Sequence, residues 1–260
     1  MNIPFYHINA FTSHTFKGNP AGVCILDNWL EDSLLQNIAM ENNLSETAFL
    51  VRQDDTHEIR WFSPTVEIDL CGHATLAAGF VLANFRDFIS AKLRFISPIS
   101  GELSVLKEGD RLTLDFPARP AMACQPPPLL LAGLQRKPIE VLKAADYLAV
   151  YESAEDILNI TPDFDLLKQL DCRAVIVTAP GKNSDFVSRF FAPGLGIDED
   201  PVTGSSHCTL TPYWKKILGK DRLHALQLSA RGGDLFCQDN GDRILISGQA
   251  VCYLEGTISF

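Results

Sequence analysis

The chain repeats a ten-residue segment at a distance close to half its length. "RWFSPTVEID" occupies residues 60–69, and "RFFAPGLGID" occupies residues 189–198. Arg, Phe, Pro, Ile and Asp coincide at five of these ten positions, at an offset of 129 residues (189 minus 60). A period this long does not fit a solenoid, whose repeats are about 20–50 residues long. The repeat therefore predicts two similar domains, each built on one supersecondary plan.

The features that follow the two segments come in the same order. The first copy continues as "LCGHATLAAGF" and the second as "EDPVTGSSHCTLTPYW". If the second copy has three extra residues after Asp198, Gly72 pairs with Gly204. Each copy then reads as a strand, a proline-containing turn, an aspartate, a glycine and an apolar segment. We expect a helix to begin within a few residues of each glycine.

Short segments rich in β-branched and aromatic residues predict strands on both sides of the repeat. The clearest cover residues 46–52, 57–63, 92–97, 101–107, 111–117, 173–181 and 186–193, and further strands close the chain. Residues 74–85 are apolar on nearly every face, which predicts a helix wrapped by a sheet. We therefore expect an α+β fold of two pseudo-symmetric domains related by an approximate two-fold axis. Each should have a curled mixed or antiparallel sheet around a central helix.

A proline-rich stretch over residues 117–130 is the best boundary between these domains. It predicts an N-terminal domain over residues 1–117 and a C-terminal domain over residues 118–260, whose last strand is able to pair back with the first domain. The segment between residues 119 and 145 is the part of this scheme with the weakest pattern.

Composition excludes several classes of partner. The net charge of −10 argues against a nucleic acid or an anionic membrane surface, since both need clustered Lys and Arg. The N-terminus lacks the basic start and apolar run of a signal peptide. Seven cysteines without a Cys-x-x-Cys motif indicate reduced thiols and a cytoplasmic protein. No second pair of ligands stands at zinc-finger or zinc-ribbon spacing, so no zinc site is expected.

The two glycines indicate a possible anion site. Glycine lets a ligand approach the backbone closely, and the free N–H groups at a helix start attract anions. Ser205 is a good candidate to cap the second helix. If Gly72 and Gly204 face one cleft, they could hold a carboxylate and stabilise negative charge next to it. Ordinary helix capping remains the alternative explanation.

Four polar residues are candidates for chemistry or binding. Glu46 stands where a helix gives way to a buried strand, and a carboxylate there could shuttle a proton. His73 directly follows Gly72, and Asp200 falls in the three extra residues of the second copy, so the two could pair across a cleft. Asn19 lies in the turn sequence "GNPAG" and is a candidate substrate contact. The alternatives are a solvated Glu46, a histidine satisfied at a helix start, and an aspartate that stabilises a helix N-terminus.

Four motifs resemble the PhzF-like family of isomerases, named after phenazine biosynthesis. They are "FKGNPAGV", "NLSETAFL", "RWFSPTVEIDLCGHATLAA" and "GIDEDPVTGSSHCTLTPYW". The resemblance implies the diaminopimelate epimerase-like fold, with an active site in a cleft between two similar domains. It also implies a metal-free and cofactor-free proton-transfer isomerase that acts on a small carboxylate. The best understood member isomerises a dihydro-hydroxyanthranilate, but the resemblance does not imply that substrate here.

Carried over by motif, Glu46 resembles the family's catalytic acid/base. Gly72 and His73 in "CGHAT" resemble substrate contacts, and Asp200, Gly204 and Ser205 in "DPVTGS" complete the polar site. The resemblance also implies a homodimer.

Two rival functions stay open at this point. A two-cysteine racemase of the same fold needs a thiol immediately before each glycine. Those positions hold Cys71 and Thr203, so two-thiol chemistry is disfavoured, while a single-thiol or two-base epimerase is not excluded. The second rival is a non-catalytic protein that binds a small molecule.

Overall fold

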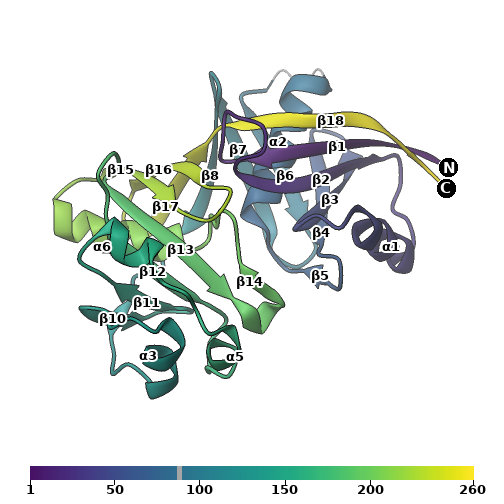
Figure 1. Ribbon diagram of the computed structural model, residues 1–260. Helices are drawn as coiled ribbons and strands as arrows, with labels where there is room; N and C mark the ends of the chain where they lie inside the picture. Colours follow the sequence, from purple (N-terminus) through teal and green to yellow (C-terminus); the bar gives the residue numbers. More distant parts are fainter. Residues whose placement is uncertain (87–89) are drawn as a thin grey trace. The chain divides into compact units, whose positions relative to one another are not determined.

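A computed structural model describes residues 1–86 and 90–260, which form two compact units (Figure 1). Unit 1 comprises Met1–Asp115 and Ser247–Phe260, and unit 2 comprises Phe116–Ile246. The C-terminal residues belong to unit 1 because β18 (Ala250–Ser259) pairs antiparallel with β1 (Asn2–Ala10). The division falls between Asp115 and Phe116, just before the proline-rich segment, and the last strand pairs back with the first unit.

Unit 1 contains a mixed sheet. Its strands pair in the order β18, β1, β2 (Asn19–Leu26), β3 (Glu46–Gln53), β4 (Thr56–Phe62), β6 (Lys92–Ser97), β7 (Gly101–Glu108) and β8 (Arg111–Pro117). The short strand β5 (Glu67–Ile68) also pairs with β4. Two pairs, β2–β3 and β4–β6, are parallel, and the others are antiparallel.

Unit 2 repeats this pattern of pairing. Its strands pair in the order β9 (Met122–Ala123), β10 (Glu140–Lys143), β11 (Tyr147–Val150), β12 (Val175–Pro180), β13 (Phe186–Ala192), β15 (Arg222–Gln227) and β16 (Gly233–Asp239). The short β14 (Ile197–Glu199) pairs with β13, and β17 (Arg243–Gly248) follows β16. The parallel pairs are β11–β12 and β13–β15. From β10 to β16 the pairings match those from β1 to β7, so the two units share one topology.

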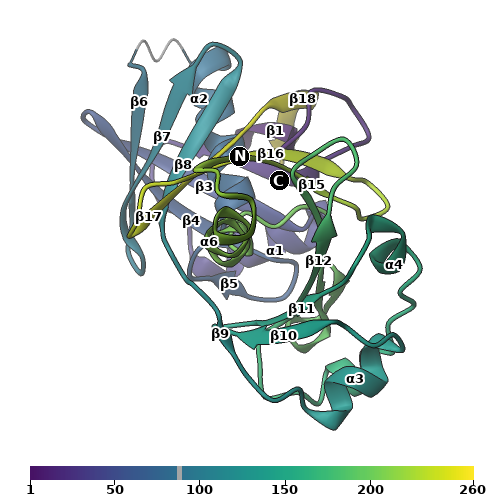
Figure 2. The ribbon, with the colours of Figure 1, turned by 90° about the vertical axis from the view of Figure 1, so that its left-hand side faces the viewer.

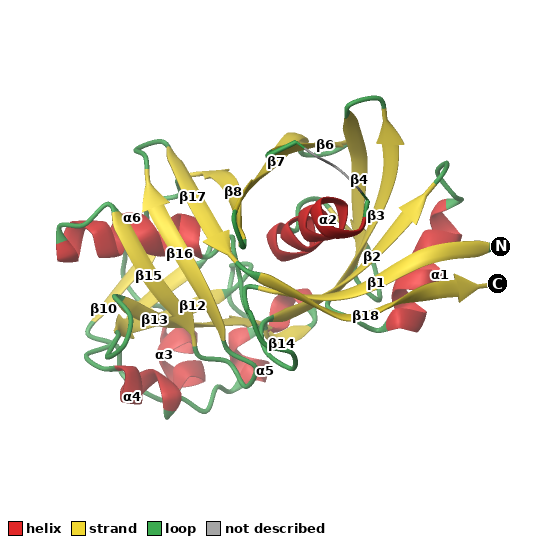
Figure 3. Cartoon of the chain, turned by 90° about the horizontal axis from the view of Figure 1, so that it is seen from above, coloured by secondary structure: helices red, strands yellow, loops and turns green. Residues whose placement is uncertain are grey.

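Each unit has a helix directly after its short strand. In unit 1, α2 (Gly72–Phe85) lies inside the curl of the sheet, as Figure 3 shows, and contacts β1, β2, β3 and β7. Nine of its residues are buried, which confirms the expected helix without a polar face. In unit 2, α6 (His207–Leu218) packs on β15 and β16, and Figure 2 looks nearly along its axis.

The remaining helices cover the outer faces of the strands. In unit 1, α1 (Asp32–Asn42) packs Leu35, Ile38 and Ala39 against side chains of β2 and β3. In unit 2, α3 (Pro128–Leu134), α4 (Ala154–Leu158) and α5 (Phe164–Leu167) contribute to a second apolar cluster. None of the helices in the described residues combines the length and apolar character needed to cross a membrane.

A half-buried ion pair recurs at the same place in both units. Arg60 donates two hydrogen bonds to Glu67, both at 2.7 Å, and Arg189 donates two to Glu199 at 2.8 and 2.9 Å. Each arginine sits in the repeated segment, and each glutamate sits on the short strand that pairs with it. The pair ties the short strand to the sheet in both copies.

The position of the three extra residues differs from the expectation. Phe62 pairs with Glu67, whereas the equivalent Phe191 pairs with Glu199, so the second connection is three residues longer (8 minus 5). The extra residues lie in a turn that contains the 3₁₀ helix Pro193–Leu195, ahead of β14. Asp200 is therefore not an inserted residue. The sequence alignment placed the insertion too late because the Ile-Asp dipeptide recurs after each turn.

Candidate active site

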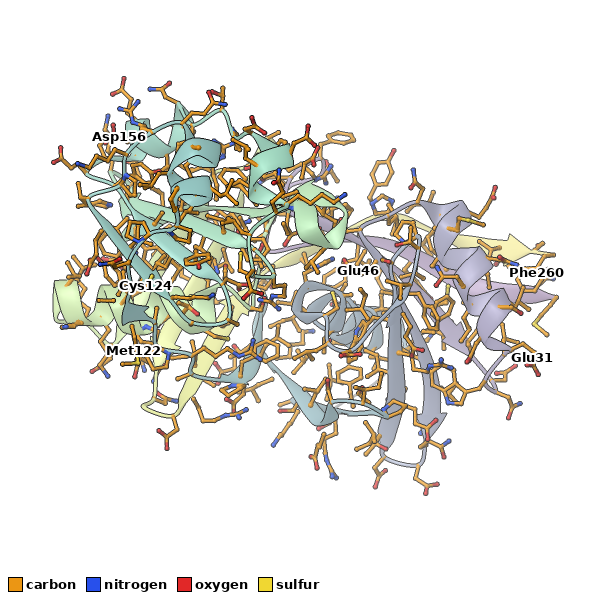
Figure 4. All side chains as sticks on the ribbon, turned by 90° about the horizontal axis from the view of Figure 1, so that it is seen from below. Glu31, Glu46, Met122, Cys124, Asp156 and Phe260 are labelled. Carbon is orange, nitrogen blue, oxygen red and sulfur yellow. The ribbon has the colours of Figure 1, made fainter. Side chains whose placement is uncertain are left out.

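Glu46 is the first residue of β3 and is held beside the central helix of unit 1 (Figure 4). Only 8% of the residue is exposed, and its Oε2 atom lies 3.1 Å from Nε2 of His73. The geometry is that of a close ion pair, without the alignment of a regular hydrogen bond. The register explains the placement, because Glu46 pairs with Ala21 of β2, whose strand begins at Asn19.

His73 lies between three polar side chains of unit 1. Its Nε2 atom faces Glu46, while Nδ1 lies 3.2 Å from the Asn19 amide nitrogen and 3.5 Å from Cys71 Sγ. Cys71 is the N-cap residue of α2, and the helix begins at Gly72. The structure thus brings together Asn19, Glu46 and His73, three of the candidate residues from the sequence. It also places Cys71 in contact with His73.

The charges in this cluster follow from burial and proximity. Burial opposes protonation of His73, but the adjacent Cys71 and Glu46 outweigh it and raise the pKa of the histidine well above its ordinary value. Burial, together with the Glu46 carboxylate, raises the pKa of the Cys71 thiol. We therefore describe the pair at its centre as a His73 imidazolium beside the Glu46 side chain. If both imidazolium nitrogens carry hydrogens, the Asn19 amide oxygen is the natural partner for Nδ1.

The same cluster contains the ligand types that metal ions use. Glu46, Cys71 and His73 each offer a ligand atom, and these atoms lie within 4.8 Å of one another. Such a mixed O, S and N set is typical of zinc. However, His73 presents one nitrogen to Glu46 and the other to Cys71, so a single ion could not bind between all three without side-chain rearrangement.

The second group of candidate residues lies in unit 2, in the segment that leads into α6. Asp200 follows β14 directly, and its side chain accepts a hydrogen bond from the Thr203 hydroxyl. Its backbone N–H donates to Phe190 O at 3.0 Å. Gly204 and Ser205 form the turn that precedes α6, since their carbonyl groups accept from the amides of His207 and Cys208.

The predicted cap of the second helix was wrong by one residue. The N-cap of α6 is Ser206, and its hydroxyl donates to Thr203 O at 2.8 Å. The amides of His207 and Cys208 donate to carbonyl groups three residues earlier, as in a 3₁₀ turn. The α-helix therefore begins at His207, and Ser205 lies just outside it. The expected helix start near Gly204 is nevertheless confirmed.

The register of the strands shows which polar residues have a counterpart in the other unit. Thr47 pairs with Phe62 in unit 1, and Val175 pairs with Phe191 in unit 2, so Glu46 is equivalent to Ala174. Gly72 and Gly204 both open the segment that becomes the central helix, which makes Ser205 the counterpart of His73. The structural ion pair is thus repeated, while the polar cluster of unit 1 is not.

The family assignment rests on the whole length of the chain. Residues 8–256 match the family described as phenazine biosynthesis-like protein, PhzC-PhzF. The chain belongs to this family. An uncharacterized isomerase of Pseudomonas aeruginosa is 52% identical over 99% of both chains. The crystal structure of a PhzF-family phenazine biosynthesis protein from Enterococcus faecalis is 46% identical, covers 100% of both chains and superposes with a TM-score of 0.98.

More distant likeness supports the fold class. The structure of a predicted epimerase from Pseudomonas aeruginosa covers 99% of both chains with a TM-score of 0.76 at 16% identity. The expected PhzF-family, epimerase-like α+β fold is therefore confirmed.

Two polar residues, one in each unit, escaped the sequence analysis of this PhzF-family chain. Cys71 was considered only as half of a two-thiol pair, although its position two residues before His73 on a helix start indicated contact. Gln227 is 1% exposed and bonds to the segment around Asp200, 27 residues away in sequence. No local sequence pattern marks it, because the contact depends on the parallel pairing of β13 with β15.

Proposed function

We propose that this PhzF-family protein is an isomerase that moves a proton on a small carboxylate-bearing substrate, with Glu46 as general acid/base. The observation that carries the proposal is the buried Glu46 carboxylate 3.1 Å from His73 Nε2, at a position where the equivalent strand of unit 2 has alanine. A buried acid that the repeated topology does not require is a candidate for function rather than for folding. Relatives that carry the name isomerase support the same reaction class.

The cluster offers what proton transfer at carbon needs. A general base must lie within reach of the labile C–H and must return the proton after the electrons have moved. One carboxylate can remove a proton from one carbon and return it to another on the same face. The positive His73 beside it stabilises the carboxylate form and places positive charge near the negative charge that develops on the substrate. Asn19 and Cys71 fix the orientation of the ring.

Like Glu46 and His73, Asp200 enters this proposal as a catalytic residue, while Gly72, Gly204 and Ser205 enter it as substrate-binding residues. Gly72 opens α2, and Asp200, Gly204 and Ser205 lie in the segment that leads into α6. Backbone N–H groups at helix starts suit a carboxylate. Their contribution to one common substrate stays a prediction.

The proposed setting is a cytoplasmic homodimer that works without a metal or organic cofactor. All seven cysteines are free thiols, which suits a reducing compartment. Light scattering at micromolar concentration tests the dimer, since a mass near the 28.7 kDa of one chain would contradict it.

Deuterium uptake from heavy water tests the reaction class. Purified protein is incubated with a panel of small cyclic and amino-acid-like carboxylates, and each C–H position is followed by NMR. The proposal expects at least one compound to gain deuterium and to change the position of its double bond or its configuration. Binding without any exchange across the panel would instead support a non-catalytic binding protein.

A second candidate is epimerisation in which the Cys71 thiol returns the proton. Cys71 Sγ lies 3.5 Å from His73 Nδ1, and its raised pKa keeps it a proton donor. Cys71→Ala separates the two candidates. The variant should retain proton transfer if Glu46 acts alone and should lose it if the thiol completes the reaction.

A further inference from the structure

The segment that leads into α6 is held by a buried glutamine from a different strand. Gln227 is the last residue of β15 and is 1% exposed. Its Oε1 atom accepts the Thr203 N–H at 2.8 Å, and its Nε2 atom donates to Asp200 O at 2.8 Å and to Thr203 Oγ1 at 3.2 Å. One amide thus makes three hydrogen bonds to the segment that carries Asp200.

A serine two residues later holds the same segment at a neighbouring point. Ser229 Oγ donates to Pro201 O at 2.7 Å and accepts the Gly232 N–H at 3.0 Å. In unit 1, Ser100 Oγ donates to Asp69 O at 2.6 Å. Asp69 and Pro201 each stand three residues before the glycine at the helix start, so this serine contact is common to both units and is part of the shared fold.

Gln227 is not part of the shared fold. The register pairs His57 with Phe95 in unit 1 and Phe186 with Ala225 in unit 2, which makes Ser97 the counterpart of Gln227. The Ser97 hydroxyl accepts the amides of Ile99 and Ser100, in its own turn. Of these two counterparts, Gln227 bonds to the segment before the central helix, and Ser97 bonds within its own turn. The segment that Gln227 holds is the one that contains Asp200.

We propose that Gln227 is a positioning residue, which fixes the backbone of Asp200–Thr203 and so aims the Asp200 carboxylate and the following amide groups at the substrate. The proposal deepens the proposed isomerase function and rests on it where it concerns substrate. Its physical basis is that the buried Gln227 amide supplies the hydrogen-bond partner that water would otherwise provide for three groups. They are the Asp200 carbonyl, the Thr203 N–H and the Thr203 hydroxyl. Loss of that amide leaves two buried backbone groups without their partner.

Two substitutions of Gln227 separate positioning from general stability. Gln227→Leu removes all three bonds at similar size. Gln227→Glu keeps an acceptor for the Thr203 N–H, but when ionised it cannot donate to Asp200 O. A protonated glutamic acid has one acceptor and one donor, like the amide, so this variant should recover as the pH falls. The matched control is Thr178→Val, because Thr178 is buried in the same unit and bonds to Val187 O and Trp214.

Two readouts decide the proposal. Hydrogen–deuterium exchange of the peptide over residues 198–206 should be at least tenfold faster in Gln227→Leu and unchanged in Thr178→Val. With a panel carboxylate that the wild type deuterates, KM should rise at least tenfold, and more than kcat falls. The Gln227→Glu defect should shrink from pH 8 towards pH 5 relative to wild type.

Wild-type exchange and KM in Gln227→Leu would overturn the proposal. So would an equal defect in Thr178→Val, or a Gln227→Glu defect that does not vary with pH. If the wild type deuterates no compound, the proposed function fails, while the exchange of residues 198–206 still decides whether Gln227 fixes the segment.

Discussion

Glu46 and Ala174 occupy the same register position in the two units of this chain. Two contacts that tie the repeated topology together are present in both units, namely the arginine–glutamate pair and the serine contact ahead of each central helix. At this register position a carboxylate is present in unit 1 alone. This asymmetry separates residues that the fold needs from residues that the chemistry needs, and it gives each class a different expected response to substitution.

The repeated arginine–glutamate pairs should govern stability and not exchange chemistry. Glu67→Gln and Glu199→Gln should each lower the free energy of unfolding by about 1–3 kcal/mol, since Arg189 then loses its carboxylate partner and Arg60 keeps only the exposed Asp32. Urea unfolding measures the loss. Glu102→Gln is the control, because its pair with Arg94 is exposed, and we expect no measurable change there. Equal losses in all three variants would contradict the account.

Gly18 should be intolerant of any side chain. Its φ is +69°, and a Cβ atom would stand 2.2 Å from Ala10 O, in the turn that positions Asn19. Gly18→Ala should therefore destabilise the protein by more than the roughly 1–2 kcal/mol of left-handed strain alone. Gly101 has φ +74°, and a Cβ atom there would meet nothing within 4 Å, so Gly101→Ala shows the strain alone. A Gly18→Ala loss no larger than the Gly101→Ala loss would contradict the predicted clash.

Acid should destabilise the protein in part through His207. Burial lowers the pKa of this histidine to about 4, and its Nδ1 lies 2.8 Å from Thr203 O. Because the folded pKa is depressed, the unfolded state binds the proton first, and stability falls as the pH drops from about 6.5 towards 4. The shift corresponds to about 3 kcal/mol. His207→Gln should reduce the loss of unfolding free energy between pH 6.5 and pH 4, while the control His14→Gln, at an exposed histidine, should not. The same pH dependence of stability in both variants would contradict this prediction.

Metal removal should leave proton transfer intact. Dialysis against a chelator should not change the rate of deuterium uptake, because the proposed acid/base is a carboxylate and needs no ion. Added Zn²⁺ should slow it, since an ion bound after rearrangement of these side chains would compete with protons for Glu46 and His73. Loss of activity on chelation, restored by Zn²⁺, would contradict the cofactor-free mechanism.

The fold was predictable from sequence because it is repeated. A five-in-ten identity, followed by a glycine and an apolar helix in both copies, was enough to predict two units of one topology. The location of the three extra residues was not predictable, since turn residues 193–196 and the Ile-Asp dipeptide fit more than one alignment. Only the pairing of Phe191 with Glu199 locates them.

The site was predictable only in part. Motif resemblance identified Glu46, His73 and Asn19, and the structure places these three together. The bonds of Gln227 could not be inferred, because they depend on which strand lies beside β13. Contacts of this kind arise from register between distant segments and leave no local pattern in the sequence.

The most direct measurement compares wild type with Glu46→Gln on a carboxylate that the wild type deuterates. Glutamine keeps the shape of the side chain and removes the base. We expect C–H exchange in heavy water to fall about 10²-fold or more, a typical contribution of a general base, with the unfolding transition and ligand affinity retained. His73→Ala and Asp200→Asn should weaken binding as well as exchange. Exchange at the wild-type rate in Glu46→Gln would contradict the central claim and make Asp200 the next candidate.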